Sequence, residues 1–588
     1  MLQESNEEVQ NPIVISEHVK TPINNKESSS SSSLRSSSDS NSNRNNKRSS
    51  TMESFDIAVK GESPLDSDTL SLEEKMWTKD YIGLYSQYAA VGLLYGMSGV
   101  TMNFCVYHFE GEPNLCANAN NFMFLAWNFK LFFAIGCDSY RPWGMRRKPY
   151  MIIGWIGVLI SLFVLAVSAD SLDASGWIGL LMVVQAFVML SDVPADGYCV
   201  ELGHLEKKER RGQILATGQR IRFTFCVIAG VIQTFLTNGT ETNAEDCKIA
   251  PDHCWKWGFS VSEYYGFMFC IVLILVLPVY FLKEMTPASE FPEHTVSEFI
   301  DKVWKIYQNL TTLYLLIYVI GTGCFVSMAN NAAVYLQYYV LEMTNFQAGI
   351  DTITTYLALV AGIYFFQKYL INRDWRFTKY LSVVFSSLLG LLWPLAYHDS
   401  GGLRNPWFTI FVDLDQQFAS GISQVLYSMA VIELASKGLE ATTYELVVSV
   451  GNSALTVGSV LSTQLLASVG AQGCTEEDIE QCPDNTVHLE SEQSFEDSNG
   501  PRKFSDYTFL IIGIQIIGAA LFVPFLPRSK EECEDWKKKG EKMGLSEYRG
   551  KIGIMISVFI ILYGITAAIM LLNVETSCEK MVGGYGCR

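Results

Sequence analysis

The amino-acid sequence predicts an all-α membrane protein that crosses the bilayer many times. Of its 588 residues, 49% are hydrophobic and only 18% are charged, and the apolar residues form long blocks with few interruptions. A bilayer-spanning helix needs about 20 mainly apolar residues, and the chain contains thirteen such blocks. Lys and Arg gather in alternate connections between the blocks, as they do in the cytoplasmic loops of membrane proteins. These three observations define a polytopic helical bundle.

The N-terminal segment, residues 1–77, precedes the first apolar block and differs from it in composition. It is rich in Ser and Asn, with an unbroken Ser run at Ser28–Ser33. Such a segment cannot bury enough apolar surface to fold by itself. It also lacks the apolar core of a secretory leader. We therefore expect a disordered cytoplasmic tail.

The thirteen predicted spans form two groups of six and one additional helix. Residues 78–282 hold the first six, and residues 311–527 hold the second six. A polar cytoplasmic linker at 283–310 separates the groups, and a charged linker at 528–551 precedes the last segment, 552–588. The predicted spans are Tyr81–Tyr107, Asn118–Ser139, Pro149–Ala169, Gly176–Val200, Gln213–Leu236, Tyr264–Leu282, Leu313–Leu341, Phe346–Leu370, Lys379–His398, Trp407–Ala435, Thr442–Val469, Tyr507–Leu526 and Ile552–Leu572.

The distribution of basic residues predicts the orientation of the chain. With the N-terminus in the cytoplasm, each inner connection carries at least one Lys or Arg, and most carry several. The outer loops carry few. Because Lys and Arg resist translocation, we expect a cytoplasmic N-terminus and an extracytoplasmic C-terminus, with the plasma membrane as the location. The inner set is Arg141, Arg146, Arg147, Lys148, Lys207, Lys208, Arg210, Arg211, Lys283, Lys302, Lys305, Lys368, Arg373, Arg376, Lys379, Lys437 and a cluster from Arg528 to Lys551.

The cysteines support the same orientation. Four pairs fall in or near outer segments: Cys105 with Cys116, Cys247 with Cys254, Cys474 with Cys482, and Cys578 with Cys587. Short-range pairs on one side of the membrane predict disulfides in an oxidising exterior. The glycosylation sequon at Asn238 lies in the same outer loop as Cys247 and Cys254. In contrast, we expect the thiols of Cys137, Cys199 and Cys533 to be free.

Ionisable residues inside the predicted spans are the first candidates for function. A charge in hydrocarbon is costly and survives mainly where it faces a cavity or another charge. Asp192 and Asp196 are four residues apart, so they share one helix face. At similar depths lie basic residues of the second and fifth spans. The predicted mixed-charge group therefore joins spans two, four and five through Lys130, Asp192, Asp196, Arg220 and Arg222.

The second half carries further polar candidates. Asp413 and Asp415 lie in span ten, two residues apart, so at most one of them faces a given cavity. Glu445 stands at the inner turn between spans ten and eleven, Asn330 interrupts span seven, and Asn452 lies in span eleven. The simpler interpretation is that all these groups only satisfy one another and lock the helices together.

A basic hairpin joins spans two and three. It runs from Trp127 to Tyr150, and its turn combines glycines, an acid and a basic pair before the next span. This pattern is typical of the cytoplasmic loop of the major facilitator superfamily, although an ordinary positive-inside turn would also carry basic residues. The residues that we expect to gate this side are Gly136, Asp138, Gly144, Arg146 and Arg147.

The chain resembles the folate–biopterin transporter family, a branch of the major facilitator superfamily. Three segments carry the resemblance: the hairpin, Ser191–Glu201 (SDVPADGYCVE), and Gly438–Asn452 (GLEATTYELVVSVGN). The resemblance extends over about Trp77 to Pro527 and implies a major facilitator-type bundle of two six-helix halves. Two features depart from the family pattern. Leu131 follows Lys130 where the family often has Pro, and the thirteenth span is additional.

The resemblance implies a secondary active transporter of folate, biopterin or a related anionic pterin. No phosphate-binding loop of the form GxxxxGK[ST] is present, so we expect coupling to an ion, with the proton as the natural choice. A buried carboxylate can change charge once per cycle. The span-four pair, Asp192 and Asp196, is the first candidate for this role, and Asp413 is the competing one. The alternatives are a major facilitator transporter of another solute, such as a sugar, amino acid or organic anion, and a non-transporting receptor.

Other classes of function find no support in the sequence. The spans contain no nucleophile–base arrangement and no metal-ligand spacing, so we expect no enzyme, no cofactor and no metal site. The net charge of −18 comes mostly from acids in the tail and outer loops. No basic stripe interleaved with aromatic residues indicates nucleic-acid binding. The expected partners are the lipid bilayer, a small-molecule solute and protons.

Overall fold

The computed structural model describes residues 71–99, 101, 104–105, 109, 123–239, 255–285, 296–435, 438–474, 486–489, 491–572, 576, 579 and 581. All of them belong to one compact unit, Asp68–Arg588. Residues 1–70 of the predicted tail lie outside the described residues. The end of that predicted tail contains a short helix, α1 (Leu72–Lys75), which Ser71 and Glu74 close with a reciprocal capping box.

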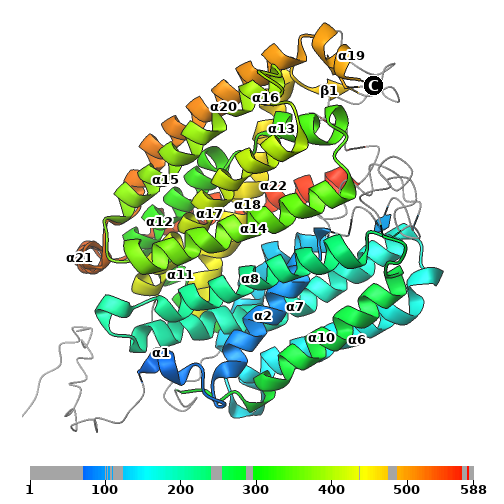
Figure 1. Ribbon diagram of the computed structural model, residues 1–588. Helices are drawn as coiled ribbons and strands as arrows, with labels where there is room; N and C mark the ends of the chain where they lie inside the picture. Colours follow the sequence, from blue (N-terminus) through cyan, green and yellow to red (C-terminus); the bar gives the residue numbers. More distant parts are fainter. Residues whose placement is uncertain are drawn as a thin grey trace, which may run out of the picture. The chain divides into compact units, whose positions relative to one another are not determined.

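The N-terminal half is a group of long helices that pack against one another (Figure 1). Helix α2 contacts α8 and α10, and α6 contacts α7 and α10. The second predicted span is divided, because a 3₁₀ segment precedes its α-helical part. The helices are α2 (Ile82–Gly96), η2 (Phe124–Phe129) with α5 (Lys130–Ser139), α6 (Lys148–Ser168), α7 (Ala174–Leu205), α8 (Gln213–Leu236) and α10 (Val261–Phe281).

The C-terminal half is the second group of helices. Its seventh span is broken near Asn330, as the sequence predicts, because the chain is not helical between η8 and α13. Two of its spans end in π-helical turns. The elements are α12 (Leu310–Gly321), η8 (Thr322–Val326), α13 (Asn331–Tyr335), η9 (Leu336–Val340), α14 (Asn345–Phe365), η10 (Phe366–Leu370), α15 (Trp375–Gly390), α16 (Trp393–Tyr397), α17 (Pro406–Leu434), α18 (Glu440–Ser468), α20 (Gly500–Phe522) and η12 (Val523–Phe525).

The prediction of an all-α polytopic membrane protein is confirmed. Among the described residues, ten helices are long and apolar enough to cross a membrane. The other three predicted spans are also helical where they are described. They are α2, η2 with α5, and α17. The first two are short in the described ranges, and α17 contains Asp413, Asp415 and Glu433. The chain is therefore a multi-pass integral membrane protein.

The two halves meet in two regions of contact. Helix α8 packs against α14, and α18 packs against both α5 and α7. The second contact holds many of the buried polar residues of the bundle, since α7 and α18 are largely buried there. The buried polar site that the halves share therefore lies beside α5, α7 and α18.

Helices also occupy the two linkers that the sequence marks as polar. The inter-half linker contains α11 (Val296–Gln308), and the charged linker contains α21 (Lys530–Met543). Helix α22 (Glu547–Leu572) is the thirteenth span; it begins five residues before the predicted position and packs against α18 and α11. A small cap completes the elements, with β1 (Gly473–Cys474) parallel to β2 (Val487–His488) and followed by α19 (Glu492–Asp497).

The cysteines agree in part with their predicted redox states. The thiols of Cys137, Cys199 and Cys533 are free, as predicted, and so are those of Cys226, Cys270 and Cys324. Cys105 is disulfide-bonded; its predicted partner Cys116 lies outside the described residues. So do Cys247, Cys254, Cys482, Cys578, Cys587 and the side chain of Cys474. Asn238 is only 3% exposed, and glycosylation there stays a prediction, as does the orientation of the chain.

We expect an impermeant maleimide to label the outer cysteines of intact cells only after a reductant is added, because disulfides protect them. In permeabilised cells Cys533 should still react slowly, since burial raises the pKa of its thiol and the thiolate is the reactive form. Mass spectrometry of the labelled peptides gives both readouts. Strong labelling of Cys247 or Cys474 before reduction would show that the outer pairs are not disulfides.

Candidate functional site

Five ionisable side chains form a buried group at the contact between the halves, which we call the central charge cluster. All five are at most 5% exposed. Four come from the N-terminal half and one comes from α18 of the C-terminal half. The members are Lys130 at the start of α5, Asp192 and Asp196 on α7, Arg222 on α8, and Glu445 on α18.

Lys130 lies at the centre of this cluster. Its Nζ atom is 2.8 Å from Asp192 Oδ2 and 3.3 Å from Asp196 Oδ2. Its third carboxylate neighbour is Glu445, with 3.7 Å between Nζ and Oε1. The Trp127 ring lies beneath the ammonium group, 5.0 Å from Nζ to the ring centroid. One cation thus contacts both halves.

Arg222 is the second cation, and it joins the same two aspartates. Its Nη2 atom donates to Asp192 Oδ1 and lies 3.4 Å from Asp196 Oδ1. Tyr88 on α2 donates to Asp196 Oδ1 at 2.5 Å, and the Arg222 guanidinium lies 4.7 Å from the centre of the Tyr88 ring. Predicting that Asp192 and Asp196 share a face with basic partners is therefore correct.

Local sequence features bring these helices close enough. Asp192 and Asp196 are one helical turn apart on α7 and flank Pro194. Gly92 on α2 lies directly against the backbone of Arg222, and a Cβ atom there would come within 1.9 Å of the Arg222 carbonyl oxygen. Only glycine allows α8 to approach α2 this closely, and this approach places Arg222 beside α7.

The central charge cluster contains two cations and three carboxylates. If every group were ionised, the cluster would carry a net negative charge in a low-dielectric interior, which is costly. One bound proton removes that charge. The two oxygens of Glu445 accept no hydrogen bond within the described part of the chain. Among the three acids, Glu445 is therefore the one whose carboxylate the cluster stabilises least.

A second buried group, which we call the arginine cluster, holds the hairpin between α5 and α6. Arg147 Nη1 lies 2.7 Å from Asp138 Oδ1. The Arg146 guanidinium bridges Glu201 on α7 and Glu440 on α18, with both distances 3.0 Å. This cluster ties the predicted gating residues to both halves.

The arginine cluster is closed by backbone contacts. The Thr442 backbone N–H and hydroxyl both donate to Asp138 Oδ2, at 2.8 and 2.7 Å. Gly144 has a φ of +71° in the turn, a conformation that favours glycine. The Gly136 carbonyl accepts a hydrogen bond from the Tyr150 hydroxyl at 3.0 Å. The predicted inner-loop residues thus belong to one structural unit, and their gating role stays a prediction.

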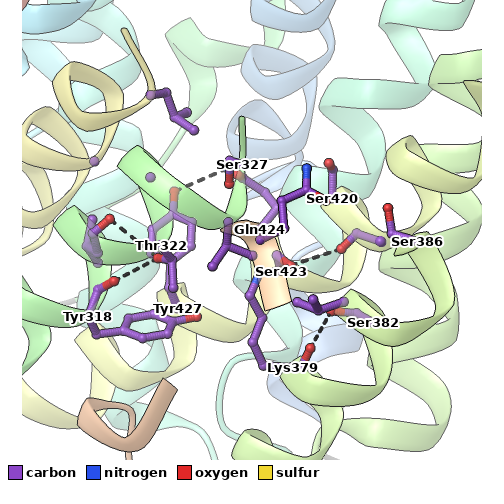
Figure 2. A pocket seen from close by; sticks show the side chains of 18 of the residues that line it. Tyr318, Thr322, Ser327, Lys379, Ser382, Ser386, Ser420, Ser423, Gln424 and Tyr427 are labelled. Atoms are coloured by element: carbon purple, nitrogen blue, oxygen red, sulfur yellow. Dashed lines mark hydrogen bonds between the residues drawn. The ribbon is translucent and has the colours of Figure 1, made fainter. Parts of the chain in front are cut away.

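A cavity of about 310 Å³ with a mixed polar and apolar lining lies within the C-terminal half, between η8, α15, α17 and α18. Figure 2 shows Lys379, Ser423, Gln424 and Tyr427 around it. Lys379 Nζ donates to Ser423 Oγ at 2.7 Å. The aliphatic part of the lining includes Val319, Val326, Val383, Val447, Val448 and Leu455. The hydroxyl, amide and aromatic part consists of Tyr318, Thr322, Ser327, Ser382, Ser386, Gln416, Ser420, Ser423, Gln424, Tyr427, Asn452 and Gln515, and Lys379 is the basic residue.

The cavity adjoins the central charge cluster. Val447 lines the cavity on α18, two residues after Glu445. On α18, Val448 and Asn452 line the cavity, three and seven residues after Glu445. Residues at this spacing share one helix face. A proton at Glu445 and a solute in the cavity would therefore be neighbours along α18.

Several predicted site residues lie elsewhere. Arg220 does not join the cluster; its Nη1 atom donates to Gln367 Oε1 at 3.0 Å, and its guanidinium lies over the Tyr364 ring. Arg222 follows two residues later on α8 and therefore faces a different direction. The sequence shows that the two arginines lie at similar depths, but not which direction each one faces. Asp413 accepts from Gln337 Nε2 at 2.8 Å, and the side chain of Asp415 is outside the described residues.

Asn330 and Asp413 line a smaller cavity that shares Ser386, Gln416 and Gln515 with the larger one. Asn330 donates to the hydroxyls of Tyr397 and Thr508, at 3.1 and 3.2 Å. Asn452 lines the larger cavity. This position is compatible with the binding role predicted for it.

Lys379 is predicted from the sequence only as one of the inner basic residues that orient the chain, at the start of span nine. A signal was present in the helical spacing of polar residues. Lys379, Ser382 and Ser386 on α15 share one face. On α17 a matching stripe runs through Gln416, Ser420, Ser423, Gln424 and Tyr427. Two polar stripes on neighbouring spans indicate a cavity between them.

The chain is similar to several known proteins. The family model described as the BT1 family matches residues 92–482. A folate-biopterin transporter from Synechocystis sp. is 22% identical over 353 residues, which cover 57% of this chain and 65% of that protein. Two solved major facilitator structures are similar at lower identity. The proton:xylose symporter XylE has a TM-score of 0.49 at 11% identity, over 77% of this chain and 98% of that one. The E. coli fucose:proton symporter FucP has 0.47 at 13%, over 75% and 99%.

Replacing Lys130 should expose how strongly the central charge cluster depends on it. We expect Lys130→Met to lower the free energy of unfolding by about 3–5 kcal/mol, because it leaves buried carboxylates uncompensated. Adding Asp192→Asn should restore part of that loss. Denaturation of the detergent-purified protein, read as a double-mutant cycle, measures both.

The matched control is Lys305→Met on α11. Lys305 pairs with Asp301 at 2.7 Å, but the two side chains are 54% and 56% exposed. An exposed pair of this kind contributes at most about 0.5 kcal/mol. Equal stability of the Lys130 and Lys305 variants would mean that Lys130 is not held by the cluster.

Proposed function

The chain belongs to the BT1 family, and from this membership we propose that it is a proton-coupled secondary transporter of folate, biopterin or a related pterin. A transporter of this fold works by alternating access, in which two helical halves rock about a shared site. The named relative from Synechocystis sp. is a folate-biopterin transporter, which supports the proposed substrate class. The chain matches about two thirds of the length of that protein, 65%. The substrate is therefore proposed here together with the transport activity.

One observation carries the proposal. The central charge cluster is completely buried, joins the two halves, and has one carboxylate more than it has cations. If the cluster only held the helices together, equal numbers of positive and negative charges would give the lowest free-energy cost of burial. An unbalanced group at the contact between the halves can gain and lose a proton as the halves separate. This property is what an ion-coupled transporter needs.

We place the exchangeable proton on Glu445. The sequence-based prediction favoured Asp192 and Asp196, but both accept from Lys130 and Arg222, whereas Glu445 is 3.7 Å from Lys130. When Glu445 is neutral, the carboxylates of α7 alone balance Lys130, and the attraction between Lys130 and α18 is lost. When Glu445 is ionised, Lys130 attracts α18 toward the N-terminal half. Protonation would thus alter the contact between the halves.

A different solute is the second candidate. The cavity lining is rich in hydroxyl and amide groups, which would suit a sugar or another polyhydroxylated molecule as well as the hydrogen-bonding edge of a pterin ring. A receptor that binds without moving its ligand would use the same cavity. Flux measurements separate these possibilities.

Proteoliposomes that contain the purified protein should accumulate labelled folate or biopterin when a proton gradient is imposed, and faster with the acidic side as the source. A sugar and an unrelated amino acid, measured in parallel, should not accumulate. Vesicles without protein are the blank. Binding of a pterin without accumulation would favour a receptor, and accumulation of the sugar alone would overturn the proposed substrate.

Glu445→Gln fixes the neutral form and should separate exchange from driven uptake. We expect exchange of internal for external substrate to continue without a gradient, while accumulation under a proton gradient is lost. The matched variant is Asp413→Asn, in the other candidate position. If Asp413→Asn loses driven uptake and Glu445→Gln keeps full pH dependence, the coupling residue lies in the second half instead.

A further inference from the structure

We propose that Lys379 is the residue that binds the negative charge of the transported molecule, through a carboxylate of an organic anion held in the cavity of the C-terminal half. This inference rests on the proposed function, and it names a site and a chemical group that the family membership does not supply. It depends on where Lys379 points and on what surrounds it.

Lys379 is buried inside the bundle and reaches the cavity. It lies one turn into α15 and is 6% exposed. Its Nζ atom donates to Ser423 Oγ at 2.7 Å, and Ser423 in turn donates to the Ala419 carbonyl at 2.9 Å. The hydroxyl hydrogen of Ser423 is therefore in use, so Lys379 must be the donor of the shared hydrogen bond. This leaves two further N–H donors on Nζ.

Within the part of the chain that the structure describes, no carboxylate lies within 4.0 Å of Lys379. Lys130 differs from Lys379 in this respect, which favours Lys379 as the residue that binds an anion. Lys130 has three carboxylate neighbours between 2.8 and 3.7 Å, and Arg222 shares two of them. An incoming anion would have to displace these acids to reach either cation. At Lys379 it would meet an uncompensated charge.

An uncompensated ammonium group in a buried cavity is costly, and natural sequences seldom keep one in a membrane span without use. A carboxylate entering the cavity would remove that cost and form a charge-assisted hydrogen bond. Ser382 and Gln424, which also line the cavity, are placed to bind polar atoms of the same molecule. Tyr318 and Tyr427 provide aromatic surface for a planar ring.

Replacement of Lys379 by Met tests the inference on the purified full-length protein. Affinity for folate, which carries carboxylates, should fall about 10- to 100-fold, the range for a hydrogen bond to a charged group. Affinity for biopterin, which carries none, should change less than twofold. Without bound ligand, the Lys379→Met variant should also unfold at a higher temperature than the wild type, because the uncompensated charge is gone. Lys379→Arg should keep part of the folate affinity.

Isothermal titration and thermal unfolding with folate, biopterin and benzoate give these values, and Lys305→Met is the control for loss of an exposed lysine. If Lys379→Met binds folate as the wild type does, the inference fails and the proposed transporter stands. Lys379-dependent binding of benzoate without binding of folate or biopterin supports the inference and overturns the pterin assignment. Destabilisation of the empty Lys379→Met protein would mean that the lysine has a structural partner and would overturn the inference.

Discussion

The fold depends on the burial of ionisable groups at the contact between its halves. Lys130, Arg222 and their carboxylate partners lie where neither water nor lipid headgroups can solvate them, so each charge must be compensated by another side chain. The compensation comes from four different helices. Since an ion pair of this kind fails if either partner moves away, the positions of α5, α7, α8 and α18 relative to one another are fixed together.

The arginine cluster repeats this arrangement at the end of the same helices. Arg146 and Arg147 connect the hairpin to α7 and α18, and Thr442 holds Asp138 from the α18 side. The two clusters are thus stacked along α5 and α18, one deep in the bundle and one at the hairpin. A movement of α18 away from α5 would break contacts in both clusters, so the proposed separation of the halves would be a concerted event and not a local one.

The cavity and the central charge cluster have opposite electrostatic characters. The cluster has more acids than bases, whereas the cavity presents Lys379 among neutral polar groups. The face of α18 that carries Glu445, Val448 and Asn452 connects the two. A solute anion at Lys379 would lie in the cavity that α18 lines, and a proton that neutralises Glu445 would bind on that same helix. Coupling between two binding events requires such a shared element.

The sequence by itself determined the membrane class, the order of the spans, and the partnership of Asp192 and Asp196 with Lys130. These properties are local: long apolar blocks, a four-residue spacing and the depth of a charge along a helix are all visible in one dimension. The rotation of each helix about its own axis was decided only by the tertiary structure. Arg220 and Arg222 have similar depths but face different neighbours, and Glu445, near an inner turn in the sequence, reaches Lys130 from the other half. In the sequence, Lys379 is only one of the basic residues that indicate the orientation of the chain. The packing of α15 against α17 places its side chain at a cavity. Which side chains face one another across two helices depends on packing between segments far apart in the chain, and no periodicity within one segment contains that information.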